Sequence, residues 1–167
     1  ARGFSTFGAY VSHVRTDASG AEQLALVDAL TTNKTSFFRE PDHFRFLAEQ
    51  IVPELLARRA GSIAGWSAGC ATGEEPYSMV VTLLDALQGR GRCEIDVLAS
   101  DVSSTALVAA RRGVYPLDAV RDVAEDTRRR YFERGVAEQE GLARVRLAVR
   151  QLVHFEHVNL LEPRRMA

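Results

Sequence analysis

The chain has 167 residues, of which 46% are apolar and 26% charged, and its formal net charge is -1 at pH 7. This composition is typical of a globular domain, and the near-neutral charge argues against a dedicated nucleic-acid-binding protein. Two cysteines, Cys70 and Cys93, are too few for a disulfide framework and suit a reducing compartment. No apolar run is long enough to span a membrane and no signal peptide is visible, so we expect no membrane insertion.

The first part of the chain predicts helices. Residues 21–30 form one helical segment, and a polar stretch over 31–36 follows it. A second helix is expected from about Pro41, because apolar residues between positions 44 and 55 recur at spacings of three and four. Pro53 should kink or divide that helix, since proline lacks a backbone N–H.

From residue 62 the pattern changes to alternating strands and helices. The expected elements are a buried strand over 62–68, a helix over 74–87, a strand over 94–100 and a helix that Ser103-Ser104 caps and Gly113 ends. This order predicts an α/β fold with a parallel sheet and crossover helices.

The last part is charged and less regular. Residues 118–134 are expected to be helical in their second half. Residues 142–150 and 153–158 both alternate apolar and polar side chains, as half-exposed strands do. They indicate either a small antiparallel piece or one hairpin followed by a return to the main sheet. We assign a β-subdomain to about residues 135–157.

The loop Gly69–Gly73 contains only small residues, and its glycines would let the backbone approach a ligand closely. A plain structural turn would also explain the loop. Asp101, at the end of the second predicted strand, could accept hydrogen bonds from both hydroxyls of a ribose. Glu74 and Glu75 follow the loop, where they would repel a pyrophosphate, although acids at a helix start also complement the helix dipole. The combination favours a positively charged nucleoside without phosphates, such as S-adenosylmethionine, over NAD or ATP.

Five segments resemble the motifs of the CheR-type chemotaxis receptor methyltransferases, in family order and spacing. They cover residues 31–40, 66–78, 99–102, 109–116 and 158–161 and include an Asn-x-Thr-x-Phe-Phe-Arg run and a Gly-Glu-Glu-Pro-Tyr-Ser run. The resemblance implies a partial Rossmann-like S-adenosylmethionine-dependent methyltransferase fold with a small antiparallel β-subdomain. We expect a fragment cut at both ends: residues 1–30 as the remnant of an N-terminal helical domain, and residues 31–167 as an incomplete methyltransferase domain.

The resemblance also implies an activity. Such enzymes transfer the methyl group of S-adenosylmethionine to glutamate side chains on the cytoplasmic domain of methyl-accepting chemotaxis receptors, leaving S-adenosylhomocysteine. Glutamate, with a pKa of about 4.3, is already ionised at pH 7, so catalysis would rest on positioning and desolvation. The resemblance further implies a cytoplasmic enzyme, and we expect a monomer. Two alternatives stay open: a methyltransferase with another acceptor, and a cofactor- or receptor-binding module without catalysis.

The same resemblance assigns residues to the cofactor site. Asn33, Thr35 and Arg39 would line the cofactor cleft, and Arg39 is the best catalytic candidate, steering a carboxylate of the substrate or cofactor. A structural salt bridge is the alternative for Arg39. Gly69 and Gly73 would allow close backbone approach.

The remaining cofactor contacts come from three places in the chain. By resemblance, Glu74 would face the methionyl ammonium or neighbouring amino groups, and Asp101 would hold the ribose. Asn159 and Leu160 would lie near the adenine.

Other candidate residues favour ordinary structural roles. His154 and His157 would point to opposite faces of an alternating strand, so we expect no metal site. Cys70 is most simply a small residue in a tight loop. The arginines at 128–130 suit a solvated helix face, whereas those between 144 and 150 could contact a receptor.

Overall fold

The computed structural model describes residues 3–58, 61–90 and 93–162. Its α-helices are α1 (Phe7–Thr16), α2 (Ala21–Leu30), α3 (Pro41–Phe46), α4 (Val52–Ala57), α5 (Glu74–Leu87), α6 (Ser104–Arg112), α7 (Glu125–Tyr131) and α8 (Leu147–Arg150). Its strands are β1 (Ser62–Ala68), β2 (Glu94–Asp101), β3 (Val114–Pro116), β4 (Phe132–Arg134), β5 (Leu142–Val145) and β6 (Val153–His157). A π-helical segment (Leu47–Ile51) joins α3 to α4, and two 3-10 segments cover Leu117–Val120 and Ala137–Gln139.

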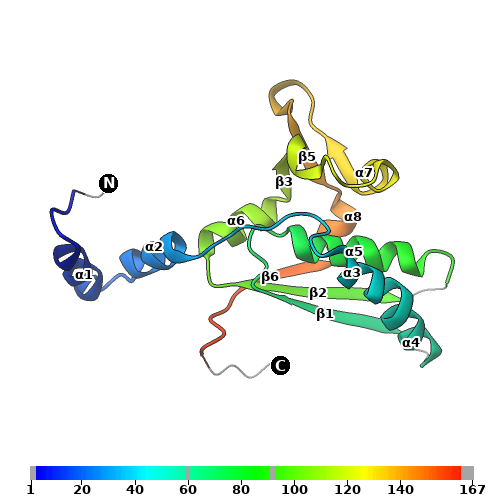
Figure 1. The fold of residues 1–167 in the computed structure, drawn as a ribbon, viewed down its shortest axis with the longest axis horizontal. Coiled ribbons are helices and arrows are strands. Elements are labelled where there is room, and N and C mark those ends of the chain that lie inside the picture. The colour runs from blue at the N-terminus through cyan, green and yellow to red at the C-terminus, as the bar shows by residue number, and fades with distance from the viewer. Residues whose placement is uncertain (1–2, 59–60, 91–92, 163–167) are drawn as a thin grey trace.

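The main sheet is parallel and has the strand order β1-β2-β6. Helix α5 connects β1 to β2, and α6 follows β2, so the predicted α/β arrangement with crossover helices is confirmed (Figure 1). Val80 and Leu83 of α5 pack in one core cluster with Val97 of β2, and all three are almost completely buried. This core fixes the carboxyl ends of the strands relative to the helix that starts beside them.

Helix α6 begins and ends as its sequence predicts. The Ser103 hydroxyl accepts a hydrogen bond from the Ala106 N–H at 3.1 Å, which satisfies a donor that the first turn leaves unpaired. Gly113 closes the helix with a φ of 59°, in the left-handed region that favours glycine. Because Ser103 is the cap and β2 ends at Asp101, the helix starts directly after the end of β2.

The small sheet differs from the sequence prediction. It has the order β3-β5-β4 and is antiparallel, so it extends from Val114 to Val145. The expected range of 135–157 is wrong at both ends, because β6 pairs with β2 in the main sheet. Residues 147–150 form the short helix α8 rather than a strand. Of the two arrangements left open, the hairpin followed by a return to the main sheet is the observed one.

The N-terminal helices lie to one side of the main sheet (Figure 1). Helix α2 matches the predicted segment, and neither α1 nor α2 contains a buried residue. Further along, the helix expected from Pro41 is divided as predicted, with the π-helical segment directly before Val52-Pro53. Within the described ranges, no helix has the length and apolar character needed to cross a membrane.

Candidate functional site

The loops that follow β1, β2 and β6 meet at one edge of the main sheet. Parallel strands present their carboxyl ends at the same edge, where α/β proteins commonly bind ligands. The carbonyl of Ser100 accepts hydrogen bonds from the N–H groups of Gly69 (2.8 Å) and Cys70 (2.9 Å). The N–H of Val158 donates to the carbonyl of Asp101 at 3.0 Å. The three loops are thus held together by backbone hydrogen bonds.

Asp101 organises this edge with both oxygens of its carboxylate. Its Oδ2 accepts a hydrogen bond from the Ala71 N–H and its Oδ1 accepts one from the Ser103 N–H, each at 2.8 Å. The side chain is only 7% exposed. Each carboxylate oxygen has a second lone pair, so contact with a ribose hydroxyl stays compatible with these bonds. The structure shows that the Asp101 carboxylate holds the loop after β1 in place through the Ala71 N–H.

Glu74 supplies a nearly buried carboxylate at the first residue of α5. It is 7% exposed, and its Oε2 accepts a hydrogen bond from the Thr72 hydroxyl at 2.7 Å. Burial raises the pKa of Glu74 above its usual value. Within the part of the chain that the structure describes, Glu74 forms no ion pair. A desolvated carboxylate that has no positively charged partner is suited to bind the ammonium group of a methionyl ligand.

The two predicted glycines of the loop have different roles. Gly69 has a φ of 82° and open space where a Cβ would lie, so its conformation requires glycine and its exposed side stays accessible. Gly73 has a φ of 97°, and a Cβ there would lie 2.9 Å from the Cβ of Ala110. Packing against α6 therefore explains why residue 73 lacks a Cβ, and the close approach of its backbone to a ligand stays a prediction. Its missing side chain lets α6 pack against the start of α5.

Phe37 anchors the segment that carries Asn33, Thr35 and Arg39. Its ring contacts Tyr115 and Phe132 edge-on, at centroid distances of 4.9 and 5.1 Å. This buried aromatic cluster joins the segment to the small sheet and to the core.

The three predicted residues of this segment have modest contacts of their own. Asn33 donates to the Ser103 hydroxyl at 3.5 Å, which brings it to the end of β2. Thr35 is half-buried. Arg39 is exposed, and its guanidinium donates to the carbonyl of Lys34 at 3.1 Å. The segment is folded back on itself, and the guanidinium keeps further donors.

Two supporting residues escaped the sequence analysis. The Ser78 hydroxyl accepts a hydrogen bond from the Phe38 N–H at 3.0 Å and donates to the Glu74 carbonyl at 2.7 Å. The Tyr115 hydroxyl donates to the Thr72 carbonyl at 2.7 Å. Both therefore fix the backbone beside Glu74. Both lie in the motif segments 66–78 and 109–116, but a motif does not reveal which backbone group a hydroxyl reaches.

Asn159 and Leu160 lie in the loop after β6. Asn159 donates to Glu162 at 3.1 Å and accepts from the Leu161 N–H at 3.0 Å, so its amide stabilises its own turn. Leu160 is exposed. The loop leaves β6 beside Asp101, at the same edge as the other predicted residues, and the adenine contact stays a prediction.

The remaining candidates have structural environments. Cys70 is 1% exposed, and burial raises its pKa to about 12, which suppresses thiolate chemistry. His154 lies 3.3 Å from Asp96, and His157 contacts the carbonyl of Val102. Among residues 3–58, 61–90 and 93–162, no three side chains of the His, Cys, Asp and Glu types are grouped as metal ligands would be.

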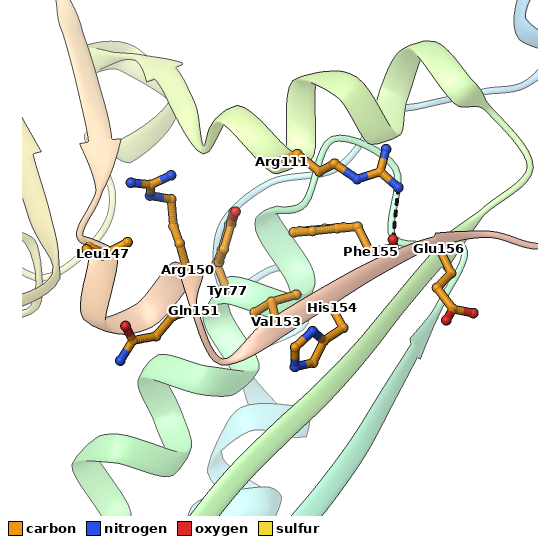
Figure 2. Close-up of a pocket in the computed structure, with 9 residues that line it drawn as sticks. All are labelled: Tyr77, Arg111, Leu147, Arg150, Gln151, Val153, His154, Phe155 and Glu156. Carbon is orange, nitrogen blue, oxygen red and sulfur yellow. Dashed lines mark hydrogen bonds between the residues drawn. The ribbon is translucent and has the colours of Figure 1, made fainter. Parts of the chain in front are cut away.

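A separate hollow of about 440 Å³ lies between α5, α6, α8 and β6. Figure 2 shows its lining, in which Arg111 donates to the carbonyl of Phe155 at 2.8 Å and Arg150 lies near Tyr77. None of the predicted cofactor residues lines this hollow. It is therefore distinct from the site at the carboxyl edge.

Comparison with known proteins decides the family. The family described as "CheR methyltransferase, SAM binding domain" matches residues 33–167. The chain belongs to the CheR methyltransferase family. The family match also supports S-adenosylmethionine as the cofactor, in agreement with the buried carboxylate of Glu74.

Curated relatives of this CheR-family chain are bacterial chemotaxis protein methyltransferases. The protein of Salmonella typhimurium is 44% identical over 97% of this chain, and methyltransferase 2 of Pseudomonas aeruginosa is 43% identical over 94%. The Escherichia coli protein is 39% identical over 95% of the chain. In each case the chain spans 54% of the relative's length, so it covers about half of these proteins.

Proposed function

We propose that this protein is an S-adenosylmethionine-dependent protein-glutamate O-methyltransferase of chemotaxis receptors. One observation carries the proposal: the nearly buried carboxylate of Glu74 lies beside the loop that Asp101 fixes, in a chain of the CheR family. That arrangement suits a cofactor with a cationic amino-acid end and a ribose.

Different residues at the carboxyl edge of the main sheet would contact different parts of the cofactor. S-adenosylmethionine, when bound, supplies an activated methyl group on a sulfonium. Glu74 would hold the ammonium, and Asp101 would accept from the ribose hydroxyls. Asn33, Thr35 and Arg39 would contact the cofactor from the segment that Phe37 anchors, and Asn159 and Leu160 would lie near the adenine. Gly69 would leave room for the ligand at the loop.

The acceptor needs no general base from this chain. A glutamate carboxylate is ionised at pH 7, so its oxygen would bond to the methyl carbon as the methyl–sulfur bond breaks, and the neutral thioether of S-adenosylhomocysteine would leave. The chain's residues would bring the acceptor oxygen and the methyl carbon together and exclude water, which are contributions of positioning and desolvation. Arg39, whose side chain is exposed, would steer the acceptor carboxylate with guanidinium donors other than the one bonded to Lys34.

The proposed partner is the cytoplasmic domain of methyl-accepting chemotaxis receptors, with the enzyme acting as a cytoplasmic monomer. The names of the curated relatives support a role in chemotaxis. We further propose that residues 1–30 belong to an N-terminal helical domain and residues 31–167 to the methyltransferase domain. The absence of buried residues in α1 and α2 supports this division.

Incubation of the full-length protein with receptor-containing membranes and methyl-labelled S-adenosylmethionine tests the proposal. We expect base-labile methyl esters on receptor glutamates, and no label when those glutamates are replaced by alanine. Cofactor binding without label on any receptor would instead support a binding module. Base-stable label on another acceptor would support a different methyltransferase.

A further inference from the structure

We propose that Asp28 of α2 is a positioning residue for the cofactor site, acting through the start of α6. This inference rests on the proposed function, because it concerns the affinity of the same site. Asp28 lies outside the segments that carry the predicted cofactor residues, and it belongs to a helix without buried residues.

Direct contacts join Asp28 to α6. Its Oδ2 accepts hydrogen bonds from the hydroxyls of Thr105, at 2.6 Å, and Ser104, at 3.3 Å. Hydrogen bonding, from Thr105 above all, holds the pKa of Asp28 below its usual value, so the side chain is a carboxylate at neutral pH. A negative charge at the first turn of a helix also interacts favourably with the helix dipole. Asp28 thus holds the first turn of the helix that Ser103 caps.

The start of α6 is in turn bonded to the site. Ser103, fully buried, caps α6 through its hydroxyl and donates its N–H to Asp101 Oδ1 at 2.8 Å. Asp101 holds the Ala71 N–H with its other oxygen. Asn33 also reaches the Ser103 hydroxyl. A continuous set of contacts therefore runs from Asp28 through the first turn of α6 to the loop after β1.

This connection explains why a half-buried acid outside the cofactor site should affect ligand binding. When the first turn of α6 shifts, the Ser103 N–H shifts with it, and Asp101 loses one of the two bonds that orient its carboxylate. Ligand contacts made by that carboxylate depend on its orientation within a few tenths of an ångström. A contact remote from the ligand can in this way change affinity by about 5-fold or more.

Titration of S-adenosylhomocysteine into the full-length protein tests the inference. Asp28→Ala and Thr105→Val should each weaken binding by about 5- to 10-fold. The double variant should be no weaker than the weaker single variant, because both substitutions remove the same contact. Asp28→Asn should bind within about threefold of the wild type, since its amide oxygen can still accept from Thr105. Asp42→Ala removes an exposed acid that pairs with Arg45 and serves as the matched control.

The thermal midpoint of each variant separates positioning from stability. A purely structural role would lower the midpoint while leaving the affinity, measured well below it, unchanged; that result overturns the inference. If Asp28→Ala does not fold, Thr105→Val still tests the same contact. If the wild type binds the ligand and both Asp28→Ala and Thr105→Val bind it with the same affinity as the wild type, this inference alone is overturned. Absence of binding in the wild type would overturn it together with the proposed cofactor site.

Discussion

The Asp101 carboxylate accepts a hydrogen bond from the backbone N–H of Ala71 at 2.8 Å, joining the end of β2 to the loop after β1. Because the same carboxylate also holds Ser103, one side chain sets the relative position of two of the three loops at the carboxyl edge. The acid predicted to contact a ribose is therefore also the residue that shapes the site around it.

Asp101→Asn should weaken binding of S-adenosylhomocysteine by about tenfold or more, since a charge-assisted hydrogen bond contributes about 1.5–3 kcal/mol. An asparagine NH₂ would also face one of the two backbone N–H donors. Calorimetric titration measures the change. Asp96→Asn makes the same substitution at an exposed position of the same strand and should leave the affinity unaltered. Equal affinities for Asp101→Asn and wild type would contradict the assignment.

Glu74→Gln should stabilise the ligand-free protein at neutral pH and weaken ligand binding. Burial raises the pKa of Glu74, so the folded state favours its protonated form. The stabilisation from that protonation is fully present below the unfolded-state pKa and is lost as pH rises through the folded-state pKa. Urea unfolding between pH 4 and pH 7 should therefore show the variant's advantage growing toward pH 7.

The matched control for that series is Glu94→Gln, at the opposite end of the sheet, where the side chain is exposed. It should show no such growth. A constant difference between Glu74→Gln and wild type across the pH range would mean that Glu74 is not desolvated. Affinity for S-adenosylhomocysteine, which carries the ammonium but not the sulfonium, should fall about tenfold, as expected for loss of a charge-assisted hydrogen bond.

Gly73→Ala should destabilise the protein by about 1–3 kcal/mol, because it adds overpacking against α6 to an unfavourable backbone conformation. The new Cβ would lie 2.9 Å from that of Ala110. Gly89→Ala also has a positive φ, of 73°, but open space around the Cβ, so it isolates the backbone contribution. Chemical denaturation measures the loss of unfolding free energy in each variant, and the loss in Gly73→Ala minus that in Gly89→Ala gives the contribution of the steric overlap. Equal losses would contradict the packing role of Gly73.

Phe37→Ala should cost about 3–5 kcal/mol of folding free energy, the usual range for a buried phenylalanine. It should also weaken cofactor binding, because the segment with Asn33 and Thr35 loses its anchor between Tyr115 and Phe132. Phe46→Ala removes an exposed ring of the same type and should change the stability by less than about 0.5 kcal/mol. Similar losses from the two substitutions would contradict the anchoring role.

Local signals predicted local structure well. The sequence predicts the cap of α6 by Ser103, its end at Gly113 and the division at Pro53, because each depends on the conformational properties of one residue. The small sheet was misplaced because its strands pair across long separations: Val114 lies opposite Arg144, and no short pattern records that partnership. The alternation of residues 142–150 also continued through a helical turn, α8, that is too short to show its own period.

In the candidate site, too, some features are predicted from the sequence and others depend on tertiary packing. The resemblance supplied the residue types, and the parallel topology brings Glu74, Asp101 and Asn159 to one edge. What the sequence could not reveal is orientation. Gly73 faces α6 and Asp101 holds backbone N–H groups, and both facts depend on tertiary packing that forms only when the helices meet the sheet.

Calorimetric titration of S-adenosylhomocysteine into the full-length protein tests directly whether the carboxyl edge of the main sheet binds the cofactor. We expect saturable binding of one ligand per chain, weakened about tenfold or more by Glu74→Gln and by Asp101→Asn and unchanged by Asp96→Asn. Binding that is absent in the wild type, or equally strong in all four proteins, would contradict the assignment of the cofactor site to the carboxyl edge of the sheet.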